Sequence, residues 1–198
     1  MKIKPIKYLF IAILIIGISG YGQFKAKMVF YSENAERSCI IYVSELNYRY
    51  EFDESNQQSI VVVKNDSKEI LILMPQQKMA IKSAIDNSLN KGNDPLKSFE
   101  NSRKSEFLVV TGKETINGIE CVKSVLMDKD YPTKKTFTMW YSEKYQFPIK
   151  MINHLDGSKD TSMELKDIES WIYDPSYFSV PEGYRLMDFS TMLPSKQK

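Results

Sequence analysis

The sequence predicts a mainly β protein with a short helical insertion (α+β). The expected architecture is an antiparallel curved sheet or half-barrel of about ten strands, closed by a helical lid. Three observations lead to this prediction. Apolar and polar residues alternate with a period of two along most of the chain, turn residues separate the alternating runs, and the alternation breaks once near the middle.

Composition narrows the possible functions. The chain has 198 residues, of which 42% are hydrophobic, with 27 basic and 25 acidic groups. This is a globular composition, and so small a basic surplus argues against nucleic-acid binding, which requires many phosphate-neutralising cations. One histidine and two cysteines exclude most metal sites and most histidine-dependent catalysis.

Residues 1–22 are predicted to be an export signal. Lys2, Lys4 and Lys7 precede an apolar run over residues 8–18, and the small residues Gly20 and Gly22 follow at a spacing of two. We expect cleavage after Gly22. A membrane anchor is the less favoured alternative, because a spanning helix needs about 20 apolar residues. Residues 23–198 are then one exported domain with a net charge of −1, because three basic groups are lost.

Five strands are expected in the first part of the mature chain. Phe24, Ala26 and Met28 share one phase, whereas Lys25 and Lys27 take the other. A turn is expected at residues 65–67, where Asn and Asp tolerate turn dihedrals. Residues 70–73 are apolar in both phases, so that strand is expected to be covered on both faces. The expected strands cover residues 24–30, 39–43, 46–52, 59–64 and 69–74.

The pattern then changes to one that predicts a helical lid. Apolar residues recur at i, i+4 and i+8 after Pro75 and before Gly92, which indicates an amphipathic helix over residues 75–91. Asp94 and Pro95 are typical of an N-cap and first helical position, and open a shorter helix to about residue 102. The lid residues are expected to be Met79, Ile81, Ile85, Leu89, Leu96 and Phe99.

Strands are expected to resume after the lid. Asn117-Gly118 and Asp156-Gly157 are hairpin signals, because these dipeptides accept positive φ. Residues 177–184 are expected to form a loop around a turn. The expected strands cover residues 107–116, 119–127, 134–142, 148–155 and 159–173.

No catalytic, metal or cofactor site is expected. His154 is interpreted as a strand histidine at the surface, because no nucleophile and orienting carboxylate are evident from the sequence. The paired carboxylates lie in expected turns or among lysines, which is typical of solvated surface. Gly112-Lys113 lacks the rest of a phosphate loop.

The apolar inner face of a strongly bent sheet is instead expected to leave a cavity suited to an acyl chain. Methionine is flexible and polarizable, so methionine-rich faces can line adaptable pockets. The expected lining residues are Met28, Phe30, Ile41, Val43, Tyr48, Tyr50, Ile60, Val62, Ile72, Met139, Tyr141 and Met151.

Two interpretations of the cysteines stay open. Cys39 and Cys121 could form a disulfide in an oxidising compartment, closing a loop worth about 4–5 kcal/mol on the chain-entropy model. Alternatively, both are buried free thiols that act as small hydrophobes.

Six segments follow one another in a recognisable order: residues 24–30, 47–51, 112–121, 139–142, 147–150 and 178–184. This ordered set resembles the LolA-like superfamily, which includes lipoprotein carriers, LolB-like acceptors and RseB-like sensors. The match is nearest to uncharacterised members with Asn-Gly-x-x-Cys and Trp-Tyr-Ser signatures.

The resemblance implies a half-barrel with a helical lid and a hydrophobic cavity. It also implies a non-enzymatic protein in the periplasm of a Gram-negative bacterium, or a secreted one, that is at most peripheral to the membrane. The implied ligand is a lipid, an acyl chain or a lipidated protein. The alternative is an envelope protein-interaction or sensor module whose cavity is filled. The carriers have an Arg-Pro pair on an early strand, whereas Arg49 is followed here by Tyr50.

Overall fold

The computed structural model describes residues 22–45, 47–54, 57–85, 96, 105 and 107–190. Within them the chain forms one sheet of twelve strands in the order β12-β6-β5-β4-β3-β2-β1-β11-β10-β9-β8-β7. The strands are β1 (Phe24–Ser32), β2 (Ala35–Ser44), β3 (Asn47–Glu54), β4 (Gln57–Lys64), β5 (Glu69–Met74), β6 (Met79–Ala84), β7 (Leu108–Ile116), β8 (Ile119–Met127), β9 (Lys135–Ser142), β10 (Phe147–Asn153), β11 (Thr161–Glu169) and β12 (Arg185–Asp188). Two 3₁₀ helices, η1 (Pro75–Gln77) and η3 (Pro175–Phe178), complete the described elements.

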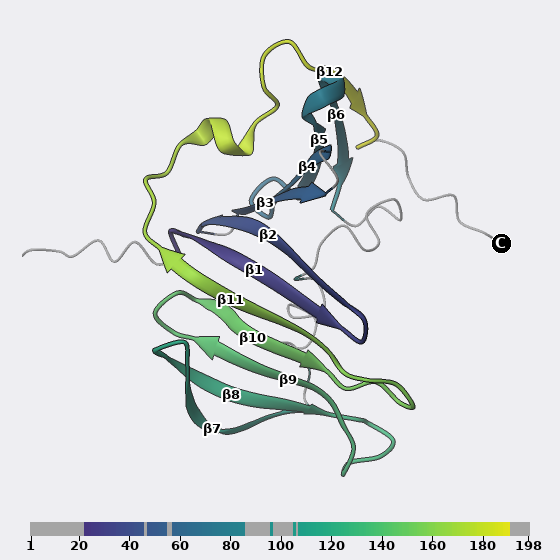
Figure 1. Ribbon diagram of the computed structural model, residues 1–198, viewed down its shortest axis with the longest axis vertical. Coiled ribbons are helices and arrows are strands. Elements are labelled where there is room, and N and C mark those ends of the chain that lie inside the picture. The colour runs from purple at the N-terminus through teal and green to yellow at the C-terminus, as the bar shows by residue number, and fades with distance from the viewer. Residues whose placement is uncertain are drawn as a thin grey trace, which may run out of the picture.

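The sheet is bent and open. Neighbouring strands are antiparallel except β12, which pairs in parallel with β6. Figure 1 shows β1 and β11 nearly face-on while β5, β6 and β12 stand more edge-on, with β7 and β12 at opposite ends. The long-range pairing of β1 with β11 joins the two halves of the chain, from Lys25 opposite Glu169 to Tyr31 opposite Ser162. The predicted antiparallel curved sheet is therefore confirmed.

The helix predicted over residues 75–91 is wrong where the structure describes it. Residues 75–77 form η1, Lys78 adopts a left-handed φ of 47°, and the chain returns as β6 antiparallel to β5. The spacing of Ile81 and Ile85 does not distinguish the two structures, because residues four apart lie on the same face of both a helix and a strand. Small or polar residues between them hid the alternation of the strand.

The remainder of the predicted lid, including Leu89 and Phe99, lies outside the described residues, and no helical lid is shown. One of the predicted lid residues in that region is described. Leu96 is 2% exposed and belongs to the hydrophobic cluster on the inner face of the sheet.

Hydrophobic clusters lie on the two faces of the sheet. The larger cluster, which defines the inner face, gathers residues such as Met28, Tyr50 and Met139 from most strands. The smaller cluster, on the outer face, lies over β4, β5 and β6 and includes Phe178. Alternate residues of β4 and β5 belong to different clusters because successive side chains of a strand point to opposite faces. The double coverage explains why these strands are apolar in both phases.

The segment between β11 and β12, residues 170–184, is called here the C-terminal strap. It crosses the outer face, as Figure 1 shows for the chain around η3. Its residues Trp171, Tyr177, Val180 and Tyr184 pack beside Phe178 against the outer cluster. Residues 177–184 of the strap were predicted as a loop. Residues 170–173 were predicted to extend the strand that begins at residue 159, whereas β11 ends at Glu169. The strand β12 beyond the strap was not predicted.

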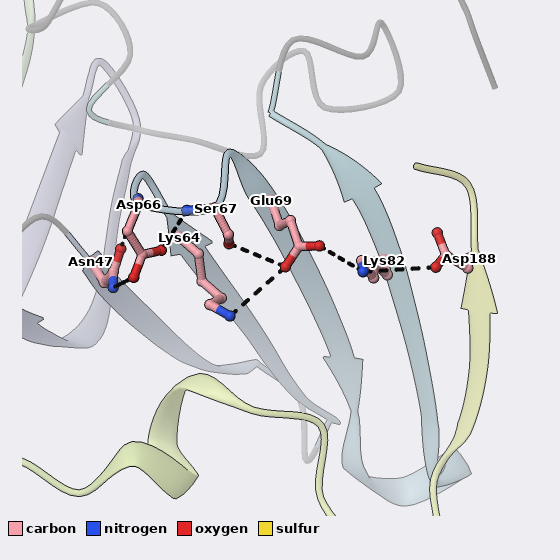
Figure 2. Close-up of polar contacts among 7 residues, drawn as sticks. All are labelled: Asn47, Lys64, Asp66, Ser67, Glu69, Lys82 and Asp188. Atoms are coloured by element: carbon pink, nitrogen blue, oxygen red, sulfur yellow. Dashed lines mark hydrogen bonds and ion pairs between the residues drawn. The ribbon is translucent and has the colours of Figure 1, made fainter. Parts of the chain in front are cut away.

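A chain of polar contacts ties β12 to the sheet (Figure 2). The Lys82 ammonium lies 2.6 Å from Glu69 and 3.8 Å from Asp188, and Lys64 contacts the same Glu69 carboxylate at 3.8 Å. The Ser67 hydroxyl donates to Glu69 at 3.1 Å. These contacts lower the pKa of the Glu69 carboxyl, chiefly through its hydrogen bond with Lys82.

Candidate functional site

A groove of about 870 Å³ opens at one end of the inner face. Its walls come from six neighbouring strands, from β4 to β10 across the sheet. This volume lies within the range of about 300–1,000 Å³ that is typical of small-molecule pockets. The described lining residues are Phe30, Tyr31, Ser32, Ala35, Arg37, Phe52, Gln57, Ser59, Met151, Asn153, Thr161, Ser162 and Met163.

The register of the strands aligns the apolar floor of this groove. Phe30 of β1 pairs with Met163 of β11, which pairs with Met151 of β10. Directly paired residues of antiparallel strands share a face, so these three side chains form one row across the sheet. Met163 and Met151 are 4% and 5% exposed, so only small parts of them reach the groove. Phe52 of β3 adds a second aromatic ring to the lining.

A polar row lies one step further out along the same strands. Ser32 pairs with Ala35 at the end of the β1–β2 hairpin, and Asn153 pairs with Thr161. The Asn153 amide donates to the Thr161 hydroxyl at 3.3 Å. The groove therefore has an apolar floor and a polar rim.

Of the predicted cavity residues, Phe30 and Met151 line this groove. Eight others lie in or against the inner cluster, where they are packed by neighbouring side chains. They are Met28, Ile41, Val43, Tyr48, Tyr50, Ile72, Met139 and Tyr141. The middle of the inner face is thus filled, and the open part lies at the hairpin end of β1 and β2.

Ile60 and Val62 were assigned to the wrong face. Both belong to the outer cluster, beneath the C-terminal strap. Residues 60–63 are apolar without interruption, so the alternation could not tell which phase faces inward. Among the lid residues, Met79 and Ile81 lie on β6, and Ile85 packs against the inner cluster.

Sequence reasoning missed most of the groove. Phe52 continues the phase of Tyr48 and Tyr50, and Met163 is one of the strand methionines, so a signal existed for both. The sequence contains no comparable signal for the polar rim, because serines, threonines and amides at strand ends are also typical of exposed hairpins. Tyr31 in this rim accepts a hydrogen bond from Lys166 at 2.8 Å, and that bond raises the pKa of Lys166.

Cys39 and Cys121 are both free and buried. Four strands lie between β2 and β8 in the sheet, so the two thiols come from strands that are not neighbours. The disulfide interpretation is therefore not supported, and the interpretation as small hydrophobes fits the structure. Burial raises the pKa of Cys39 to about 12 and that of Cys121 to about 11.

His154 has a hydrogen-bonding partner at each of its ring nitrogens, on the outer side of β9 and β10. One ring nitrogen, Nε2, lies 2.8 Å from the Thr138 hydroxyl, and the other, Nδ1, lies 2.8 Å from Asp160. The order of these groups is that of a hydroxyl, a base and an orienting carboxylate. Thr138 is only 5% exposed and does not line the groove, so its hydroxyl is poorly placed to reach a substrate.

A smaller, more polar hollow of about 530 Å³ lies at the other end of the strands, beside the β7–β8 and β9–β10 turns. The Asn117 amide, in the β7–β8 turn, donates to the Leu165 carbonyl at 3.0 Å and to Glu164 at 2.9 Å. The pairing of β10 with β11 stops at Lys150 opposite Glu164. Pro148, just beyond, has no N–H to continue it. The Asn117 side chain thus links the β7–β8 turn to β11 where the pairing of β10 with β11 ends.

The described residues contain no group of three or more His, Cys, Asp or Glu residues that could hold a metal ion. The helices within the described ranges are all too short or too polar to cross a bilayer.

Neither protein-family models nor curated protein sequences match this chain. Its fold is similar to that of an uncharacterized conserved protein from Thermus thermophilus. That match has a TM-score of 0.58 and 11% identity, and covers 86% of this chain and 92% of that chain.

Looser likenesses have TM-scores below 0.5. A chain of the Pseudomonas aeruginosa MucA/MucB complex has a TM-score of 0.45 and 9% identity, and the match covers 85% of this chain and 59% of that chain. A LolA superfamily protein from Nitrosomonas europaea gives 0.39 at 11% identity, over 80% of this chain and 90% of that chain. The sequence resemblance implied a curved antiparallel sheet, and the structure has such a sheet. At these identities the likeness concerns the fold alone.

Proposed function

We propose that this chain is an exported, non-enzymatic binding protein that holds an acyl chain in the groove of its inner face. The observation that carries the proposal is the accessible volume of about 870 Å³ above the row of Phe30, Met163 and Met151. The proposal includes export after cleavage behind Gly22, residues 23–198 as one domain, and a location in the cell envelope or outside the cell.

The energetics favour a long aliphatic ligand. Each buried methylene contributes about 0.8 kcal/mol, so a 16-carbon chain gains on the order of 10 kcal/mol before the costs of association. Two methionines and two phenylalanines supply an apolar surface that can adapt to a flexible chain. Free lipid and the acyl chain of a lipidated protein present the same chemistry to this floor.

The proposal is tested by filling the groove. Ser59 lines the groove from β4, and a Ser59→Trp variant would place an indole in that space. The matched control is Gln58→Trp, because the neighbouring residue of a strand points to the opposite face. We expect Ser59→Trp to weaken binding of a neutral hydrophobic fluorophore, N-phenylnaphthylamine, at least about tenfold, and Gln58→Trp to leave it unchanged. A tenfold change corresponds to about 1.4 kcal/mol.

Native mass spectrometry after mild extraction provides the direct measurement. The exported protein should carry, or take up, a species with an acyl chain, and the Ser59→Trp variant should not. Protein that never takes up an acyl-chain ligand, or equal fluorophore binding by both variants, would contradict the proposal.

A second candidate function is an interaction or sensor module for another envelope protein. Two observations favour it: the filled middle of the inner face, and the exposed strand β7 at the end of the sheet. Val109 and Val110 on β7 are 50% and 65% exposed. Within the described ranges β7 is a terminal strand, and edge strands of this kind can accept a partner strand. Cross-linking should then recover one stoichiometric protein partner, which Val110→Lys loses; recovering none would remove this candidate.

A further inference from the structure

The charged residue in the groove lining indicates which class of acyl-chain ligand the groove fits. Arg37 is the one charged residue among the described lining residues, and no Asp or Glu is among them. The chain as a whole has nearly as many acidic groups as basic ones. Arg37 therefore brings a positive charge to the described lining of the groove.

Polar side chains that can donate a hydrogen bond to an anion line the same groove. They are Gln57 and Ser59 from β4 and Thr161 from β11. An arginine guanidinium has five N–H donors in a planar fork that fits a carboxylate or phosphate, so it can bind an anion beside another contact.

The register places Arg37 at one end of the apolar row. Arg37 of β2 pairs directly with Phe30 of β1, and the row continues through Met163 to Met151. A ligand lying across the strands would therefore meet the cation first and the apolar floor next. This order matches a molecule with an anionic head and one aliphatic tail.

We propose that the groove selects single-chain anionic amphiphiles, with the carboxylate or phosphate head at Arg37 and the tail over Phe30, Met163 and Met151. This inference rests on the proposed acyl-chain function and adds the class and the orientation of the ligand. The anion is part of the amphiphile, so inorganic phosphate alone has no tail to hold it in the groove.

The test is displacement of N-phenylnaphthylamine by ligands with matched 16-carbon chains. Palmitate and palmitoyl lysophosphatidic acid are the anionic competitors, hexadecanol is the neutral one, and inorganic phosphate is the head without a tail. We expect the anionic amphiphiles to compete about tenfold better than hexadecanol, because hydrogen bonds to charged groups are the stronger ones.

Arg37→Gln should remove that preference and leave hexadecanol binding unchanged. Lys27→Gln is the matched control, since it removes the same charge from β1, and Lys27 does not line the groove. Equal competition by anionic and neutral ligands in the wild type would overturn the inference while leaving acyl binding intact. Competition by phosphate alone, or loss of the preference in Lys27→Gln, would also overturn it. Failure of the fluorophore and of every competitor to bind would instead contradict the proposed function itself.

Discussion

Phe178 should be the side chain that holds the C-terminal strap on the sheet, and its removal gives a quantitative test of the fold. Phe178 is 4% exposed and packs with Ile60, Val62 and Leu73 in the outer cluster. Its ring also stacks on Tyr173, with ring centroids 5.8 Å apart. The strap is therefore anchored by one nearly buried aromatic residue.

The expected cost of Phe178→Ala follows from this burial. Buried phenylalanine-to-alanine changes cost about 3–5 kcal/mol, which combines lost transfer energy with the cavity left behind. Tyr173 is 43% exposed and can relax into part of that cavity, which favours the lower end. We expect a loss of about 3 kcal/mol in the free energy of unfolding, or about 6–12 °C in Tm for a domain of this size.

Urea unfolding followed by tryptophan fluorescence measures this loss, because Trp171 lies in the strap. The midpoint should fall with little change in the slope m, since the same surface is exposed on unfolding. Ile172→Ala is the matched control: Ile172 is also in the strap but 91% exposed, so its truncation should change stability by less than about 0.5 kcal/mol. A loss below about 1 kcal/mol for Phe178→Ala, or equal losses for the two variants, would refute this account of the strap.

Three further predictions concern thiols, acid and the strap carbonyl. Burial raises the pKa values of Cys39 and Cys121 to about 12 and about 11. Iodoacetamide at pH 8 should therefore alkylate the two thiols only as fast as the protein unfolds. Rapid labelling of either thiol in native buffer would contradict their burial. Glu69, whose pKa is lowered chiefly by Lys82, stabilises the folded state above its ordinary value of 4.5, and this contribution is lost as the pH falls through the lower folded value. Glu69→Gln should therefore cost about 1 kcal/mol or less at pH 7 and nothing at pH 2, and a constant cost across urea titrations at both pH values would exclude the ion pair as its cause. Arg49 donates to the Tyr177 carbonyl of the strap at 2.8 Å, so Arg49→Met should cost about 2 kcal/mol in urea unfolding, whereas an unchanged midpoint would show that this bond does not hold the strap.

Arg49 connects β3 to the C-terminal strap. Arg49 contacts Glu51 at 2.7 Å and the Tyr177 carbonyl at 2.8 Å, and its guanidinium lies 5.2 Å from the centre of the Tyr177 ring. It therefore holds the strap on the outer face and does not face the groove.

Strands and turns could be predicted because their signals are local. The hairpin at Asn117-Gly118 and the alternation through β1 depend on residues adjacent in sequence, and both are present in the structure. The strand β6 could not be predicted with the same signals, because its apolar spacing fits a helix equally well. Hydrogen bonding to β5 on one side and β12 on the other decides in favour of the strand.

Local alternation and turn residues predict a mainly β chain with short turns and an apolar face on most strands. For β4, which phase faces inward depends on how the whole sheet is covered, and Ile60 and Val62 turn outward. The tertiary structure also decided where the groove opens, because Phe30, Arg37 and Met151 meet only through pairings between strands far apart in sequence. Alternation is a property of one strand, whereas curvature, coverage and a pocket are properties of the assembled sheet.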